Sequence, residues 1–313
     1  MIDVVVLFFL FGLAAGLARS ELKLPASLYE ALSVFLLLAI GLKGGEGLAK
    51  QALGPLLPQV GAVVLLGVAQ TLIAFAILRA LGRLGRADAA ATAAHYGSVS
   101  VATFAVGVNW LVARNIAFEP QMAVLLAVME VPAIMVGIVL ARGVGKHTDW
   151  RGLAHETFLG KGVTLLLGGM AIGWIAGPEG LAPIKGLFSD LFKGALALFL
   201  LEMGLIVSHH VGELRRQGVF LVAFGLLMPI VSGLLGLACG MLLGLSVGGL
   251  TLLATLAASA SYIAVPTAMR IAVPQANPAL SLAAVLGVTF PFNILLGIPL
   301  YHRLATQLLG ATP

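Results

Sequence analysis

The sequence predicts an all-α polytopic membrane protein with about ten transmembrane helices, arranged as two inverted five-helix repeats. Only 10% of its 313 residues are Asp, Glu, Lys or Arg, and 60% are hydrophobic. Soluble domains carry about 25% charged residues. The apolar runs are long and unbroken, whereas strands of membrane barrels give short alternating segments. This composition excludes a soluble enzyme, a disordered chain and a disulfide scaffold, and the single cysteine, Cys239, has no partner for a bridge.

A membrane-spanning helix needs about 20 mostly apolar residues. Charged residues, Pro and Gly divide the chain into ten apolar segments, which predict one helix each. These segments span residues 2–18, 25–43, 55–79, 88–112, 121–142, 159–177, 186–209, 217–243, 248–270 and 278–305. The first begins without a basic region, so we expect a retained helix and not a cleaved signal peptide.

The basic residues indicate an orientation in the bilayer. Of the 18 Lys and Arg residues, 12 fall in one set of alternate loops and 6 in the other. Because cytoplasmic loops carry the excess of Lys and Arg, the first set is predicted to be cytoplasmic. Both termini then lie outside, and the long polar loop near 143–158 is cytoplasmic. These residues occur singly, so no nucleic-acid partner is expected.

Two pairs of similar stretches support the repeat. Residues 35–42 resemble residues 198–205, and residues 99–103 resemble residues 263–267, at offsets of 163 and 164. An odd number of helices in each half inverts the second half relative to the first, which is a common plan of secondary transporters. We predict a first repeat at 1–145, a cytoplasmic connecting loop at 146–158 and a second repeat at 159–313.

The fourth and ninth segments each place hydroxyl residues beside a helix breaker, Gly97 in one and Pro266 in the other. Helices broken in mid-membrane free backbone N–H groups, and the N-termini of the half-helices attract anions. The alternative is two intact helices in which Ser and Thr stabilise helix packing. The predicted substrate-binding residues are Gly97, Ser98, Ser100, Thr103, Ser261, Tyr262, Pro266 and Thr267.

Acidic residues within apolar spans are costly and are functional candidates by default. Glu130, which Pro132 follows closely, is the first candidate for a cation ligand or proton carrier. Glu202 and Ser259 complete the predicted cation-coupling set. The alternative for each acid is a carboxylate satisfied by neighbouring polar groups. Nucleophile elbows, HExxH and Walker motifs are missing from the sequence, so we expect neither an enzyme nor an ATP-driven pump.

Several stretches together resemble the bacterial sodium-dependent bicarbonate transporter family. They occur in the family's order and extend over nearly the whole chain. The similar stretches are Ile40–Gly45, Asp88–Thr103, Met129–Ala133, Val211–Arg215 and Ala257–Pro278. The resemblance implies two inverted repeats in the bacterial inner membrane and a sodium-coupled anion held between broken helices. It also implies a homotrimer and a PII-like signalling protein as regulatory partner.

The resemblance is uneven at the predicted site. Gly97, Ser100 and Pro266 match the family's pattern, and Glu130 stands where the family has Asp, which keeps the charge. Tyr262, in contrast, replaces an Asp. Since a sodium site needs oxygen ligands and a carboxylate is the strongest available, this departure leaves sodium and protons open as coupling ions.

Three functions follow as hypotheses. The leading one is a symporter of bicarbonate or a related small anion, with sodium as the coupling ion and no other cofactor. The second is a transporter of another organic or inorganic anion on the same scaffold, with proton coupling or without sodium. The third is a non-transporting membrane sensor or assembly subunit.

Overall fold

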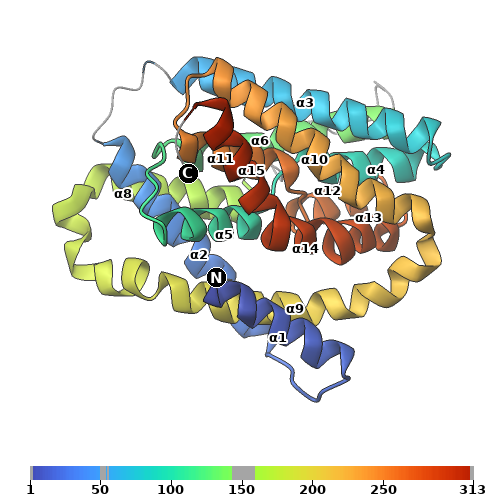
Figure 1. The fold of residues 1–313 in the computed structure, drawn as a ribbon, viewed down its shortest axis with the longest axis horizontal. Coiled ribbons are helices and arrows are strands. Elements are labelled where there is room, and N and C mark those ends of the chain that lie inside the picture. Colours follow the sequence, from blue (N-terminus) through green and yellow to red (C-terminus); the bar gives the residue numbers. More distant parts are fainter. Residues whose placement is uncertain (1–2, 50–53, 55, 143–158, 311–313) are drawn as a thin grey trace.

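The computed structural model describes residues 3–49, 54, 56–142 and 159–310, and its elements are helices (Figure 1). The predicted connecting loop at 146–158 lies outside these residues. The first half contains α1 (Val4–Leu17), α2 (Ala26–Leu48), α3 (Leu56–Ala80), α4 (Arg86–Gly97), α5 (Val101–Val112) and α6 (Met122–Arg142). The second half contains α8 (Lys161–Leu181), α9 (Phe192–Gln217), α10 (Val219–Leu242), α11 (Val247–Ala258), α12 (Ala264–Ala272), α13 (Pro278–Ala284), α14 (Phe290–Phe292) and α15 (Ile298–Leu308).

Seven of the described helical stretches are long and apolar enough to cross a membrane. They are α2, α3, α6, α9, α10, the stretch from Lys161 to Ile184 that begins with α8, and the stretch from Pro278 to Leu308 that contains α13 to α15. The predicted all-α membrane protein is therefore confirmed at this level. Ten spans require α1 and the short helices α4, α5, α11 and α12 to cross as well.

The helices form two groups. The first bundle consists of α1, α2, α8 and α9, in which α1 packs on α9 and α2 packs on α8 and α9. The second bundle consists of α3 to α6 and α10 to α15, in which α4 packs on α3 and α6, and α11 packs on α10 and α15. In Figure 1, α1 crosses α9 at the bottom, while α3 and α10 run side by side at the top. The predicted site residues of the fourth and ninth segments lie in the second bundle.

The first bundle is held at backbone-to-backbone distance by glycines. A Cβ atom at Gly204 would lie 2.2 Å from the carbonyl oxygen of Phe9, and one at Gly41 would lie 2.5 Å from that of Leu166. Small residues permit such close approach between membrane helices, where dispersion forces provide the attraction. The second predicted segment stops at residue 43, whereas α2 continues to Leu48. Gly41 and Gly45 approach the backbone of α8, and Gly44 and Gly47 approach Ala123 and Pro120.

Polar contacts group the loops at the two ends of the bundles. Ser246, before α11, donates its backbone N–H to the Glu119 carboxylate over 2.6 Å. Asn277, before α13, donates its N–H to the Asp88 carboxylate over 2.7 Å. The first contact joins two loops, and the second joins the segment before α13 to the first turn of α4.

Glycine packing in the first bundle leads to a stability prediction. A Cβ at Gly173 would lie 2.2 Å from the carbonyl oxygen of Leu42, whereas one at Gly168 on the same helix meets nothing within 4 Å. Overpacking costs about 1–3 kcal/mol. We therefore expect Gly173→Ala to lower the melting temperature in detergent, and Gly168→Ala to leave it unchanged or raise it. Equal melting temperatures for the two variants would contradict tight packing of α2 on α8.

Candidate functional site

Two interruptions of helical structure face each other inside the second bundle. The α4 helix ends at Gly97 and α5 begins at Val101, and Ser100 between them has an extended backbone (φ −111°, ψ 114°). The α11 helix ends at Ala258 and α12 begins at Ala264, and Ser259 is likewise extended (φ −77°, ψ 170°). Each interruption frees backbone N–H and C=O groups that need partners, because helix ends leave them unpaired.

The partners of each interruption lie in the other one. The buried Ser100 N–H donates to Ser259 Oγ over 2.8 Å. Ser261 donates its N–H to the carbonyl oxygen of His95 over 2.9 Å. In return, His95 Nδ1 lies 2.5 Å from the Ser261 carbonyl oxygen and donates to it, because a carbonyl only accepts. Three hydrogen bonds thus join the interruptions, although more than 150 residues separate them in sequence.

Two buried amide side chains cover the end of α11. Gln70 Nε2 donates to the Ala257 carbonyl oxygen and Asn293 Nδ2 donates to the Ala258 carbonyl oxygen, each over 2.8 Å. Both side chains have no solvent exposure. The sequence analysis missed Gln70 and Asn293, as well as His95. A signal was present, because a polar amide in an apolar span is costly unless it has a hydrogen-bond partner.

The predicted residues of the first interruption lie together. Ser100 caps α5, and its Oγ accepts from the Thr103 N–H over 3.2 Å and from Thr103 Oγ1 over 3.0 Å. Ser98 Oγ donates to the Glu130 carbonyl oxygen over 3.4 Å. Gly97 has no room for a side chain, since a Cβ there would lie 1.9 Å from Thr71 Oγ1. The hydroxyls are therefore fixed by short-range hydrogen bonds and by packing on α3 and α6.

A cavity of about 660 Å³ opens beside this meeting point. We call it the Glu130 cavity. Its wall includes the first residues of α5, Val101 and Ala102, and the residues at the start of α12, Ile263 and Ala264, together with Glu130 of α6. The positive ends of two helix dipoles therefore border the same space as a carboxylate.

The electrostatics of the Glu130 cavity suit ions of both signs. Ile263, which precedes α12, provides no side-chain cap for this helix. Ser261 Oγ accepts the Val265 N–H over 3.4 Å and Pro266 has no N–H, so among the first three residues of α12 the Ala264 N–H is the one that a ligand could approach. The Glu130 side chain is 8% exposed, and no ion pair involves it in the part of the chain that the structure describes. Lys161 lies 3.9 Å from Glu30 at the rim, but both side chains are more than half exposed. Such pairs contribute about 0–1 kcal/mol.

The predicted residues of the second interruption divide into two groups. Thr267 lines the Glu130 cavity, and its Oγ1 donates to the Ile263 carbonyl oxygen over 3.1 Å. Pro266 occupies the first turn of α12, where its missing N–H leaves no intrahelical bond unmade. Tyr262 lies outside the cavity wall, packed edge to face on Phe290 with ring centroids 5.7 Å apart. Its buried hydroxyl has no hydrogen-bond partner among the described residues.

Glu202 does not join this site. It lies on α9 in the first bundle and is not part of the Glu130 cavity wall. One of its carboxylate oxygens is buried without a hydrogen-bond partner among the described residues. Its assignment to cation coupling therefore has less geometric support than that of Glu130.

Comparison with protein families identifies the chain. Residues 4–306 match the model of the Na+-dependent bicarbonate transporter superfamily. Because the match covers nearly the whole chain, the protein belongs to this superfamily, which comprises transporters and not enzymes. A search of curated proteins finds no match to the chain.

The junction of the two interruptions predicts unequal effects for two buried serines. Ser259→Ala removes the acceptor of the Ser100 N–H, and a buried unpaired donor costs about 1–3 kcal/mol. Ser232 is equally buried, but its hydroxyl has no partner in the described chain. We expect Ser259→Ala to lower the melting temperature of the purified protein and Ser232→Ala to leave it nearly unchanged. A larger decrease for Ser232→Ala would argue against the junction as a structural element.

Proposed function

We propose that this member of the Na+-dependent bicarbonate transporter superfamily is a symporter of bicarbonate or a related small anion, driven by a sodium gradient. One observation carries the proposal: the N-termini of two interrupted helices and the Glu130 carboxylate border a single cavity. Backbone N–H groups at helix N-termini attract anions, and a carboxylate attracts cations. One cavity thereby offers a place to each of two cotransported ions.

The anion would bind where α5 and α12 begin. Its hydration would be replaced there by the N–H groups of Val101 and Ala264 at the starts of the two helices and by the hydroxyl of Thr267, which would turn away from the Ile263 carbonyl oxygen to donate to the anion. Ser100 and Thr103 hold the start of α5 in place. The hydroxyls of Ser98 and Ser261 belong to the same junction, and they extend the polar surface that a bound anion would contact when the bundles move.

The cation would bind at Glu130. The carboxylate is almost fully buried but borders the cavity, and its charge has no partner within the described residues. Taking an unpaired charge out of water is expensive, so the site favours an arriving cation. Sodium fits because carboxylate and backbone oxygens are hard ligands, and Ser259 lies at the adjoining junction.

The proposal includes broken spans within two inverted repeats. In this interpretation, α4 with α5 and α11 with α12 each form one crossing, and both termini lie outside the inner membrane. Equivalent contacts support it: a Cβ at Gly12 would meet the Leu201 carbonyl, and one at Gly169 would meet the Leu38 carbonyl. Offsets of 157 and 163 relate these partners. The same offsets relate the contact of Gly204 with the Phe9 carbonyl of α1 to the contact of Gly41 with the Leu166 carbonyl of α8.

Alternating access would come from movement between the bundles. The Glu130 cavity lies between them, with α2, α8 and α9 on one wall and α5, α6 and α12 on the other. The tight glycine packing makes the first bundle a rigid body, as such a movement requires. Oligomerisation as a trimer and regulation by a PII-like protein remain proposals by resemblance.

A second candidate substrate is a less hydrated organic anion. Most residues of the Glu130 cavity wall are apolar, including Leu36, Leu37 and Phe199. Tyr262, which stands where the related family has Asp, adds further apolar surface near the junction. An apolar wall stabilises the hydrocarbon part of an organic anion, but it does not replace the hydrogen bonds that water makes to bicarbonate. Thermal stabilisation by organic carboxylates but not by bicarbonate would favour this candidate.

Uptake measurements test the proposal directly. Purified protein in proteoliposomes is expected to accumulate labelled bicarbonate when a sodium gradient points inward. Accumulation should fall to the level of empty vesicles without any ion gradient, because a symporter needs the driving ion. A proton gradient in place of sodium distinguishes the two coupling ions. The absence of bicarbonate uptake under every gradient would exclude bicarbonate as substrate.

Variants of Glu130 test the coupling site. Glu130→Gln keeps the shape but removes the charge that attracts the cation; a loss of about 1.4 kcal/mol of binding energy corresponds to tenfold weaker binding, so sodium-driven uptake should fall about tenfold or more. Glu130→Asp keeps the charge and should retain sodium dependence. Glu30→Gln alters an exposed rim carboxylate and serves as the control. Unchanged sodium dependence in Glu130→Gln would remove Glu130 from the mechanism.

A further inference from the structure

A second cavity, of about 700 Å³, lies at the opposite end of α2 and α5. We call it the Lys43 cavity. Its wall includes Ile40 and Lys43 of α2, Phe104 and Val108 of α5, and Lys193 of α9. Like the Glu130 cavity, it lies between the first and second bundles.

The two cavities follow one stripe of side chains along α2. Residues 29, 30, 33, 36 and 37 border the Glu130 cavity, and residues 39, 40, 43, 44 and 47 border the Lys43 cavity. The recurrence at three and four positions places them on one helix face. Leu37, the last of these residues at the Glu130 cavity, and Ala39, the first at the Lys43 cavity, are therefore less than one helical turn apart.

The α5 helix presents a matching stripe. Val101 and Ala105 border the Glu130 cavity, whereas Val108 and Val112 border the Lys43 cavity. Ala105 and Val108 are three residues apart, which is a rise of about 4.5 Å along the helix axis. The cavities thus approach each other along both helices to within about one layer of side chains.

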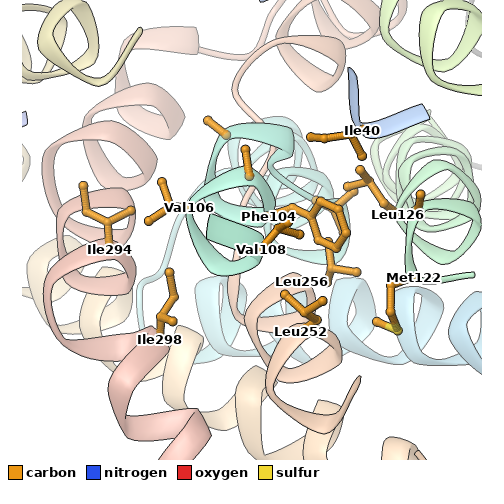
Figure 2. Packing of buried hydrophobic residues seen from close by; sticks show 14 of the residues in the cluster. Ile40, Phe104, Val106, Val108, Met122, Leu126, Leu252, Leu256, Ile294 and Ile298 are labelled. Carbon is orange, nitrogen blue, oxygen red and sulfur yellow. The ribbon is translucent and has the colours of Figure 1, made fainter. Parts of the chain in front are cut away.

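That layer is apolar and closely packed. It consists of Leu37 and Ile40 of α2, at 6% exposure each, and Phe104 of α5, at 2%. All three belong to one buried cluster. Figure 2 shows the Phe104 ring projecting from α5 toward Leu126 of α6, with Ile40 nearby. Side chains from both bundles therefore lie between the residues that border the two cavities along this stripe.

We propose that the two cavities are the opposite ends of one translocation path and that Leu37, Ile40 and Phe104 form its hydrophobic gate. This inference rests on the proposed transport function and adds the residues that prevent leakage. An apolar constriction excludes ions because it contains no water, and moving an ion into an apolar surrounding without hydration or polar ligands costs much free energy. Phe104 provides the largest side chain of the layer, so it closes most of the gap.

Cysteine accessibility tests the gate without requiring transport. The only cysteine of the sequence, Cys239, is replaced by Ser, and single cysteines are introduced as Ala102→Cys or Val108→Cys. An anionic, membrane-impermeant methanethiosulfonate is added from one side of the vesicle at a time. Because Ala102 borders the Glu130 cavity and Val108 the Lys43 cavity, each cysteine should react faster from a different side.

Opening the layer should remove this difference. Phe104→Ala is expected to raise the slower rate of each cysteine about tenfold or more, which corresponds to a barrier lowered by about 1.4 kcal/mol. Ile40→Ala should act in the same direction and serves if Phe104→Ala does not assemble. Phe224→Ala truncates an equally buried phenylalanine outside both cavity walls and should leave the rates unchanged.

Two results would overturn the inference. Faster reaction of both cysteines from the same side would show that the cavities do not open to opposite faces. Rates that stay unchanged in folded Phe104→Ala and Ile40→Ala would show that this layer is not the barrier. Either result is independent of whether bicarbonate uptake is observed, because the thiol reaction needs no substrate.

Discussion

The structure depends on satisfying the backbone groups that two helix interruptions leave free in an apolar interior. Within a membrane, each unpaired N–H or C=O group costs several kcal/mol. Here Ser259 accepts the Ser100 N–H, and His95 and Ser261 exchange two further bonds. Neither interruption is satisfied by itself, so the halves of the chain must fold onto each other. The same arrangement leaves the starts of α5 and α12 free to face a cavity.

The two bundles divide the mechanical roles. Carbonyl-to-glycine contacts in the first bundle leave no space in which its helices can shift, whereas the second bundle carries the interruptions and Glu130. Both cavities lie at the boundary, where most wall residues are apolar and Asn109 of α5 donates to the Asp3 carboxylate before α1 over 3.3 Å. In the proposed mechanism, a relative movement breaks this contact and changes apolar contacts, which are individually weak, while the hydrogen-bonded junction stays within the second bundle.

The sequence was sufficient to predict the membrane class and most residues of the first interruption. A glycine beside serines in an apolar span, such as Gly97 with Ser98 and Ser100, is a local signal. A polar amide in an apolar span marks Gln70 and Asn293 as candidates, but their partners are carbonyls of distant segments, which no local pattern identifies. The second predicted segment ended at residue 43, five residues before the end of α2, because the packing of Gly41 and Gly45 on α8 is a tertiary feature. The apolar layer at Phe104 was invisible for the same reason, since its sequence resembles any membrane helix.

If an anion and a cation bind in the same cavity, as proposed, their charges interact directly. Coupling between the two ions then needs no communication between separate sites. An anion at the starts of α5 and α12 makes the Glu130 cavity more negative, and a cation at Glu130 compensates that charge. In an apolar surrounding, where Coulomb interactions are strong, each ion therefore increases the affinity for the other. The pair together is closer to neutral than either ion alone, so it passes an apolar layer between the bundles at lower cost. In the proposed symport, coupling then follows from electrostatics and burial, and the ion gradients set the direction of net transport.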